Sequence, residues 1–362
     1  MKAAVLREIG KPLQIEDVAI SKPGPREVLV RTVAAGLCHS DLHFMEGSFP
    51  YPLPAVLGHE SAGIVEQVGS DVKTIKPGDH VVTCLNVYCG HCDYCVTGHL
   101  NLCTSTETLR DGNEEPRLAR PGGGVMNQYL NLSSFAEYML IHEHACVAIR
   151  KDMPLDRAAL VGCAVTTGVG AVTQTAAVRP GDTVAIIGCG GVGLSAVSGA
   201  AIAGAGRIIA IDLSPAKAEL AKAFGATDFI ASSECNPVEA VMEMTKGGVH
   251  HSIEAIGRPD TASQAFEMLR AGGVATIIGL IPPGTKVSVD GYALLRERRL
   301  QGSFMGSNRF PVDMPRLVDF YMNGKLNLDA MISNRIKLEQ INEGFDEMKK
   351  GALARSVIMF DN

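Results

Sequence analysis

The chain has 362 residues, of which 46% are hydrophobic and 20% are charged, and its formal net charge is −6 at pH 7. This composition is typical of a globular protein and excludes a disordered or fibrous chain, while the length suggests two domains. The acidic balance, with no run rich in lysine and arginine, argues against nucleic acid as a partner.

The N-terminal residues carry no export signal. Lys2, Arg7 and Glu8 place charges there before an apolar run of signal-peptide length develops. Residues 183–206 have few charges and are long enough for a membrane helix, but their glycine cluster is typical of a soluble strand-to-helix turn. We therefore expect a cytoplasmic protein without a membrane partner, in which the ten cysteines stay reduced.

Thiols and imidazoles that could hold a metal occur first in GLCHSDLH at residues 36–43, then in LGHE at 57–60 and GCAVTTG at 162–168. Cys38, His59 and Cys163 would give a zinc ion two thiolates and one imidazole. One tetrahedral position would then be left for water or substrate, which is what catalysis requires. The loose spacing leaves open whether the three residues converge in the fold.

A denser group of cysteines lies in YCGHCDYCVTGHLNLC, residues 88–103. Its spacing is C-x2-C-x2-C-x7-C, with these members: Cys89, Cys92, Cys95 and Cys103. Four thiolates in a glycine-containing loop can surround one zinc ion and leave no open position. We predict a closed, structural zinc site in the lobe 89–103, with merely clustered reduced thiols as the alternative. Four further cysteines lack such spacing and are expected to be buried and inert: Cys84, Cys146, Cys189 and Cys235.

From residue 183 onward, apolar segments of strand type alternate with helical segments. Strands are expected at 183–188, 207–213, 226–230, 249–257, 274–280 and 298–306. Helices are expected at 191–205, 215–225, 237–247 and 259–273. This alternation predicts an α/β fold, a doubly wound parallel sheet with helices on both faces.

The first strand and helix of this series are joined by GCGGVG. Gly188, Gly190 and Gly193 form a G-x-G-x-x-G turn, and Asp212 ends the second strand nineteen residues after Gly193. Backbone N–H groups and the helix dipole favour a pyrophosphate there, and the Asp212 carboxylate can accept hydrogen bonds from ribose hydroxyls. Because this carboxylate would repel a 2′-phosphate, we predict NAD rather than NADP. A tight packing turn without a ligand is the alternative.

With two zinc signatures followed by a dinucleotide fold, the whole chain resembles the zinc-dependent medium-chain alcohol dehydrogenases. The matching stretches are GLCHSDLH, GHESAGIVEQVG, KPGDHVV, the four-cysteine lobe, GCAVTTGVGA, GCGGVGL and INEGFDEMKKGALARSVIMF. The resemblance implies a discontinuous catalytic domain at 1–164 and 305–362, with an irregular, chaperonin-10-like β fold. It places a Rossmann domain that binds NAD at 165–304.

The same resemblance implies residue roles, since two cysteines and a histidine are the known catalytic zinc ligands of alcohol dehydrogenases. Cys38, His59 and Cys163 would hold one of two zinc ions per subunit, with Glu60 behind the metal or transiently on it. Ser40 would take the proton of the alcohol and pass it through the cofactor ribose to His43 and solvent.

Cofactor contacts are also implied by motif position. His39 stands where the commonest pattern has an arginine, so a weaker grip on the pyrophosphate is expected. The other implied contacts are Thr167 near the nicotinamide, Lys217 at the ribose and Arg355 at the pyrophosphate.

By resemblance, four uncharged side chains line the substrate channel: Phe49, Leu85, Tyr129 and Ile281. We expect hydride transfer between NAD(H) and a primary alcohol or aldehyde with an apolar or aromatic tail. A glutathione-adduct formaldehyde dehydrogenase of the same family is one alternative, but the basic residues it needs at the pocket mouth form no clear set. A non-catalytic, zinc-stabilised nucleotide-binding protein is the other, and it would have no use for an open zinc site.

Residues 104–128 form a long polar connection, which in compact domains is usually functional or mobile. Among the proteins that the chain resembles, those that keep a long loop here tend to be dimers and those with a short loop tetramers. We therefore predict a homodimer. Light scattering of the purified protein should give the mass of two chains, and the mass of four would reject this prediction.

Overall fold

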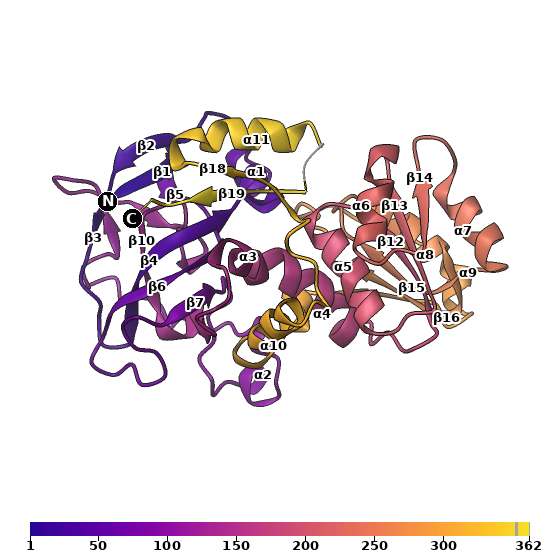
Figure 1. Ribbon diagram of the computed structural model, residues 1–362, viewed down its shortest axis with the longest axis horizontal. Coiled ribbons are helices and arrows are strands. Elements are labelled where there is room, and N and C mark those ends of the chain that lie inside the picture. The colour runs from indigo at the N-terminus through magenta and orange to yellow at the C-terminus, as the bar shows by residue number, and fades with distance from the viewer. Residues whose placement is uncertain (352–353, 362) are drawn as a thin grey trace. The chain divides into compact units, whose positions relative to one another are not determined.

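The computed structural model describes residues 1–351 and 354–361, so residues 352, 353 and 362 of the predicted catalytic domain lie outside the described part. The chain divides into two compact units. The first consists of Met1–Cys163, Arg309–Met322 and Met331–Asn362, and the second of Ala164–Asn308 and Asn323–Ala330. Figure 1 shows the C-terminal strands β18 and β19 in yellow among the indigo strands of the N-terminal part. The first unit is therefore built from segments far apart in the sequence.

The first unit is mainly β-structure. One sheet has the order β2 (Gln14–Asp17), β1 (Lys2–Leu6), β5 (Ala55–Val56), β9 (Asn127–Gln128). A larger sheet has the order β11 (Cys146–Ile149), β7 (His80–Thr83), β6 (Glu60–Val68), β4 (Glu27–Gly36), β19 (Arg355–Met359), β18 (Ile332–Ile336), and β10 (Tyr138–His142) also pairs with β4. A two-stranded sheet joins β3 (Ala19–Ile20) and β8 (Leu118–Ala119). The helices of this unit are α1 (His39–Met45), α2 (Asp93–Val96), α3 (Leu155–Leu160), α10 (Phe310–Met322) and α11 (Ile341–Lys349).

Strand β4 shows why these residues form a sheet around a core. In a strand successive side chains point to opposite faces. Val28 and Val30 are fully buried and pack against Val65 of β6 and Met139 and Ile141 of β10. Val28 and Val30 thus point into the core, together with the buried Thr32, whereas Arg31 on the other face is partly exposed.

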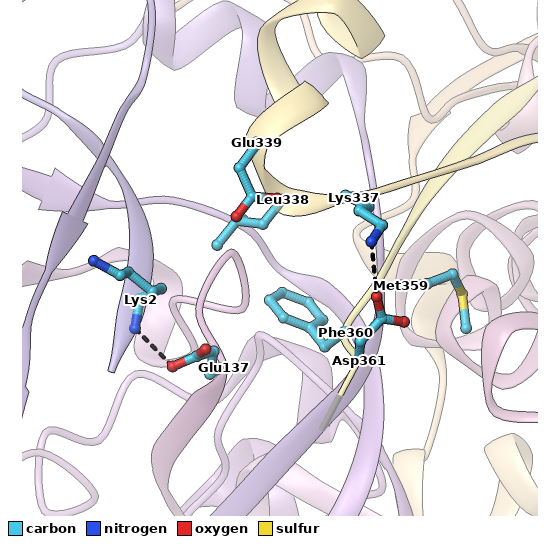
Figure 2. Close-up of a pocket in the computed structure, with 8 residues that line it drawn as sticks. All are labelled: Lys2, Glu137, Lys337, Leu338, Glu339, Met359, Phe360 and Asp361. Atoms are coloured by element: carbon cyan, nitrogen blue, oxygen red, sulfur yellow. Dashed lines mark hydrogen bonds and ion pairs between the residues drawn. The ribbon is translucent and has the colours of Figure 1, made fainter.

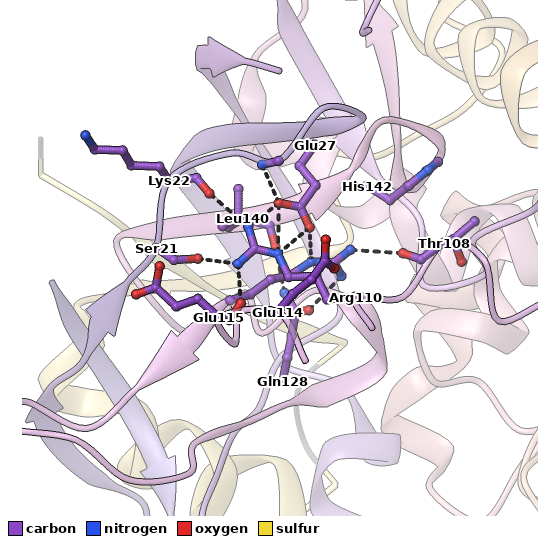
Figure 3. A network of polar contacts seen from close by, with 12 residues as sticks. Ser21, Lys22, Glu27, Thr108, Arg110, Glu114, Glu115, Gln128, Leu140 and His142 are labelled. Atoms are coloured by element: carbon purple, nitrogen blue, oxygen red, sulfur yellow. Dashed lines mark hydrogen bonds and ion pairs between the residues drawn. The ribbon is translucent and has the colours of Figure 1, made fainter. Parts of the chain in front are cut away.

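A buried carboxylate holds the long connection of residues 104–128, which follows the four-cysteine lobe. Glu27, at the start of β4, accepts hydrogen bonds from Arg110 and from Arg117, whose Nε lies 2.6 Å away. Arg110 also donates to Ser21 Oγ and to the carbonyl of Lys22 (Figure 3). Burial alone would raise the pKa of Glu27, but the hydrogen bonds from Arg110, the Gly24 N–H and Arg117 together outweigh it and lower the pKa. Arg110 and Arg117, two of the three arginines in the connection 104–128, are therefore paired with a carboxylate inside the first unit.

The second unit contains a six-stranded parallel sheet. Its order is β14 (Asp228–Ala231), β13 (Arg207–Asp212), β12 (Thr183–Ile187), β15 (Val249–Glu254), β16 (Leu269–Ile277), β17 (Arg299–Gly302). Its helices are α4 (Thr166–Gly170), α5 (Gly191–Ile202), α6 (Ala218–Ala223), α7 (Pro237–Thr245), α8 (Pro259–Glu267) and α9 (Gly291–Leu294). The strand order reverses between β12 and β15, as in dinucleotide-binding sheets. The predicted doubly wound α/β fold is confirmed.

Two apolar stretches could suggest a membrane span by composition. The helical stretch Leu155–Thr175 is long and apolar enough, but 89% of its most apolar window is buried inside the structure, as in a core helix. Residues 183–206 instead form β12, a turn and the helix α5, followed by a short turn. Both stretches therefore belong to the folded interior.

The cysteines outside the two predicted metal sites differ in exposure. Cys84, Cys146 and Cys189 are buried, as predicted, and burial raises the pKa of Cys189 to about 12. Cys235 is exposed, so the prediction that it is buried was wrong. It lies in the turn between β14 and α7, just before the cap of that helix at Asn236.

Candidate functional site

The four cysteines of the lobe 89–103 come together in the first unit. Their sulfur atoms lie within 4.8 Å of one another, with 3.8 Å between Cys89 and Cys95 and 3.8 Å between Cys92 and Cys103. A tetrahedral zinc ion with Zn–S bonds of about 2.3 Å requires sulfur atoms about 3.8 Å apart. All four are free thiols, and backbone N–H groups, that of His91 first, lower the pKa of Cys89 to about 6. The donor set therefore fits a closed zinc site.

A second candidate site is formed by Cys38, His59 and Cys163. Their ligand atoms also lie within 4.8 Å of one another, and all three side chains are buried. Cys38 caps the N-terminus of α1, His59 immediately precedes β6, and Cys163 lies in a π-helical turn directly after α3. A hydrogen bond from Cys163 is the largest influence that lowers the pKa of Cys38, followed by the nearby Arg355. Two thiols and an imidazole fit zinc with a fourth position left for another ligand.

Asp41 is a member of this site that the sequence did not predict. Its Oδ1 lies 3.0 Å from His59 Nδ1, and its Oδ2 accepts a hydrogen bond of 3.2 Å from the backbone N–H of Cys38. A carboxylate on one ring nitrogen fixes the tautomer of a metal-binding histidine and leaves Nε2 for the metal. The sequence feature that could have identified this residue is the position of Asp41 in the first turn of α1, three residues after Cys38.

Glu60 and Arg355 lie behind the ligands. Glu60 is fully buried, burial raises its pKa to about 7, and its Oε1 lies 3.5 Å from Arg355 Nε. Arg355 also donates to the carbonyl of Leu37 at 3.2 Å and to Cys38 Sγ at 3.7 Å. The role predicted for Glu60, behind the metal or transiently on it, stays a prediction. The contact predicted between Arg355 and a pyrophosphate stays a prediction.

The residues predicted for proton transfer, Ser40 and His43, lie on one short helix. Both belong to α1, as does His39, which was predicted to contact the pyrophosphate, and Ser40 Oγ is 3.7 Å from Cys38 Sγ. Ser40 and His43 are three positions apart, so they lie on the same side of the helix. His39 is exposed at the start of the helix. One helix thus carries both residues of the predicted proton relay, but the role of each residue stays a prediction.

Of the four predicted channel residues, two belong to an aromatic cluster beside His59. Phe44 contacts both Phe49 and Tyr129, with ring centroids 5.5 and 4.9 Å apart, and the Tyr129 ring lies 6.0 Å from that of His59. Leu85 packs instead at the margin of the core that contains Val28 and Val30. Ile281 lies in the second unit.

The predicted cofactor residues belong to the second unit, except His39 and Arg355. Gly190 caps α5, Gly188 has a φ of 98°, and a Cβ on Gly193 would lie 1.7 Å from the carbonyl oxygen of Gly188. Gly188 and Gly193 are thus required by a tight turn at a helix N-terminus, where N–H groups can bind phosphate, whereas a side chain at position 190 would meet no neighbour within 4 Å. Thr167 is buried in α4, with its hydroxyl 3.6 Å from Met305 Sδ.

Asp212 stands at the end of β13 next to this turn. It accepts hydrogen bonds from the backbone N–H groups of Cys189 and Ser214, at 2.8 and 3.0 Å, and forms an ion pair of 3.1 Å with Lys217. These contacts fix the carboxylate where a ribose would be recognised in this type of fold. The turn, Asp212 and Lys217 together fit a nicotinamide dinucleotide.

A pocket of about 170 Å³ opens elsewhere on the first unit (Figure 2). Its polar residues largely pair with one another: Lys337 with Asp361 at 3.2 Å, and the backbone N–H of Lys2 with Glu137 at 2.7 Å. It contains none of the predicted site residues.

Two family models match the chain. An alcohol dehydrogenase GroES-like domain matches residues 24–151, and a zinc-binding dehydrogenase domain matches residues 191–322. GroES is a chaperonin-10, so the fold predicted for the catalytic domain is confirmed.

Individual relatives match over nearly the full length of both chains. An S-(hydroxymethyl)glutathione dehydrogenase of Photobacterium damsela subsp. piscicida is 40% identical over 99% of each chain. Among solved structures, an alcohol dehydrogenase zinc-binding domain protein of Burkholderia ambifaria is 38% identical over 100% of this chain and 99% of its own, with a TM-score of 0.95. A benzyl alcohol dehydrogenase of Acinetobacter calcoaceticus is 34% identical over 99% of each chain, with a TM-score of 0.93. A zinc-binding dehydrogenase of Sinorhizobium meliloti 1021, solved with NADP, is 31% identical over 99% of each chain, with a TM-score of 0.84.

We expect mutations in the two cysteine-containing sites to have different effects on stability and on activity. Cys95→Ala should lose one zinc ion and unfold or aggregate at lower temperature, because a closed site contributes to folding. Cys38→Ala should lose the other zinc ion and all turnover while staying folded. Zinc content, thermal unfolding and activity measure the three effects.

Cys146→Ala is the matched control, because Cys146 is buried outside both clusters. It should keep both zinc ions. A Cys95→Ala protein that kept both zinc ions and the stability of the wild type would contradict the structural assignment.

Proposed function

The chain belongs to the zinc-binding medium-chain alcohol dehydrogenase family and is a zinc-dependent alcohol dehydrogenase, and from this premise we propose that it transfers hydride between NAD(H) and primary alcohols or aldehydes with an apolar or aromatic tail. The observation that carries the proposal is the position of the aromatic cluster beside the buried ligands Cys38, His59 and Cys163. A substrate oxygen held there would have uncharged rings around its carbon chain. The alternative of a non-catalytic nucleotide-binding protein is set aside, since the family is one of enzymes.

Zinc, when bound, supplies a Lewis acid that polarises the substrate oxygen. Cys38, His59 and Cys163 would hold it, and Asp41 keeps His59 in the orientation that presents Nε2. Arg355 offsets the negative charge of the Cys38 thiolate and of Glu60. These contacts keep the ligand set rigid in a site that excludes water.

The proton of the alcohol has to leave this buried site. Ser40 can accept it because its hydroxyl lies next to Cys38 at the start of α1. His43, one helical turn further on and partly exposed, can release it to solvent.

NAD is proposed as the cofactor because of Asp212. Its carboxylate would accept ribose hydrogen bonds and repel a 2′-phosphate. The relative of Sinorhizobium meliloti was solved with NADP, so membership of the family does not decide between the two cofactors. The charge at position 212 supports NAD for this chain.

The name of the Photobacterium relative favours a second candidate, the oxidation of a glutathione adduct. Such a substrate carries carboxylates and needs basic residues to bind them. Arg110 and Arg117 are both engaged by the buried Glu27 and by neighbouring carbonyl groups, so they are poorly placed to bind a ligand. This arrangement supports the apolar alcohol as the first candidate.

Asp212→Gly should weaken the use of NAD and improve that of NADP, because it removes ribose hydrogen bonds and the repulsion of a 2′-phosphate. The ratio of kcat/KM for the two cofactors should shift by about tenfold or more. Asp228→Asn, at the start of the neighbouring strand β14, should leave the ratio unchanged. A wild-type preference for NADP would refute the assignment.

An alcohol panel tests the substrate class. Catalytic efficiency should rise from ethanol towards hexanol and benzyl alcohol, by up to about fourfold per methylene group, because each buried methylene contributes about 0.8 kcal/mol. Sugar alcohols should be poor substrates because their hydroxyl groups would lose hydrogen bonds to water.

The same panel includes formaldehyde with glutathione, and the Cys38→Ala protein gives the background rate. Higher efficiency with the glutathione adduct than with benzyl alcohol would transfer the proposal to the second candidate. Higher efficiency with ethanol or a sugar alcohol would contradict the apolar channel.

A further inference from the structure

Tyr129 carries a buried hydroxyl group without a hydrogen-bond partner. The residue is 0% exposed, and its oxygen is among the buried polar atoms of the described residues for which no partner is found. Buried polar groups are nearly always hydrogen-bonded, because an unpaired group loses its interaction with water and gains nothing in return. An unpaired hydroxyl of this kind points to a partner that binds from outside the chain.

The side chain cannot easily turn to find a partner within the protein. Its ring is packed at steep angles against Phe44, Tyr51 and His59, with centroids 4.9, 5.3 and 6.0 Å away. Its backbone N–H donates to Ser133 Oγ at 2.8 Å, and that hydroxyl donates to the carbonyl of Val56 at 2.7 Å. Tyr129 is therefore held in one orientation.

The backbone that follows Tyr129 is also strained. Leu130, Asn131 and Ser133 have φ values of 47°, 61° and 58°, which non-glycine residues rarely adopt. Such conformations persist where the surrounding structure holds them, and they are common at ligand sites. The strain supports a fixed position for the ring of Tyr129.

The hydroxyl of Tyr129 can serve as a donor beside the candidate zinc site. A phenol O–H both donates and accepts hydrogen bonds. The Tyr129 ring packs against that of His59, one of the candidate zinc ligands, with 6.0 Å between the ring centroids. A donor in this position suits an oxygen atom held by the same site.

We propose that the Tyr129 hydroxyl donates a hydrogen bond to the oxygen of the alcohol or aldehyde substrate, as a specificity-determining residue. This inference rests on the proposed function, because an alcohol with an apolar tail offers its reacting oxygen as the single acceptor. The aromatic ring packs the tail, and the hydroxyl selects a substrate whose oxygen reaches the site beside His59.

The proposal has a thermodynamic signature that a purely structural tyrosine lacks. In the ligand-free protein the unpaired hydroxyl is destabilising, so Tyr129→Phe should leave the melting temperature unchanged or raise it. In the complex the hydroxyl has a partner, so the same substitution should weaken binding. Stability and affinity are then expected to change in opposite directions.

Tyr51→Phe is the matched control. Tyr51 belongs to the same aromatic cluster, but its hydroxyl already donates to the carbonyl of Gln128 at 2.8 Å. Removal of this hydroxyl should lower the melting temperature by about 2 °C, because a hydrogen bond within the folded protein is lost.

The experiment uses the full-length zinc-loaded protein with NADH and benzamide, an unreactive analogue whose carbonyl oxygen accepts hydrogen bonds. Benzamide binding, followed by NADH fluorescence, should be about three- to tenfold weaker for Tyr129→Phe than for the wild type. Thermal unfolding without ligand gives the stability of each variant.

Equal benzamide affinity for Tyr129→Phe and wild type, or a loss of stability as large as that of Tyr51→Phe, would overturn this proposal alone. Absence of benzamide binding by the wild type, together with absence of benzyl alcohol oxidation, would overturn it along with the proposed function.

Discussion

The candidate catalytic site depends on the antiparallel pairing of β4 with β6. Gly36 pairs with Glu60 at the end of this ladder, so the chain that continues to Cys38 and the chain that arrives from His59 lie side by side. Close approach is possible because position 36 has no side chain: a Cβ there would lie 2.5 Å from Glu60 Oε1. Gly162 has the same role for the third ligand, since a Cβ there would lie 2.8 Å from the carbonyl oxygen of Thr83 in β7. The strand pair and two glycines thus bring Cys38 and His59 together with Cys163, which lies more than a hundred residues further along the sequence.

The same site concentrates buried charge, which is unfavourable unless each charge has a partner. Asp41 is balanced by His59 at 3.0 Å, and Glu60 lies 3.5 Å from Arg355. Arg355 reaches the site from β19, which pairs with β4 through Val357 and Gly36. The C-terminal segment therefore completes the electrostatics of a site whose ligands all precede residue 164. Loss of either partner would leave a buried charge uncompensated, so these contacts constrain the site more tightly than packing alone would.

The sequence predicted those features whose evidence is local. The four-cysteine spacing, the glycine turn and the alternation of strands and helices are each contained in short stretches, and the structure places them as expected. Asp41 and the position of Arg355 beside Glu60 were not predicted, because they depend on pairing between distant strands. The helix expected at 259–273 ends at Glu267, since Leu269 already pairs in β16. The error at Cys235 has a similar origin: hydrophobicity suggested burial, but the residue falls in a turn.

The cofactor turn is held in place by contacts within the chain. Gly193 has to approach the carbonyl of Gly188, and Asp212 already accepts two backbone N–H groups, so the phosphate-binding backbone and the carboxylate are held in place. The entropy that a flexible loop would lose on binding is thereby largely removed. The ion pair of Asp212 with Lys217, however, partly neutralises the charge that should exclude a 2′-phosphate. The proposed preference for NAD would then depend less on repulsion than on hydrogen bonds from the ribose hydroxyls to the fixed carboxylate, which a 2′-phosphate would remove.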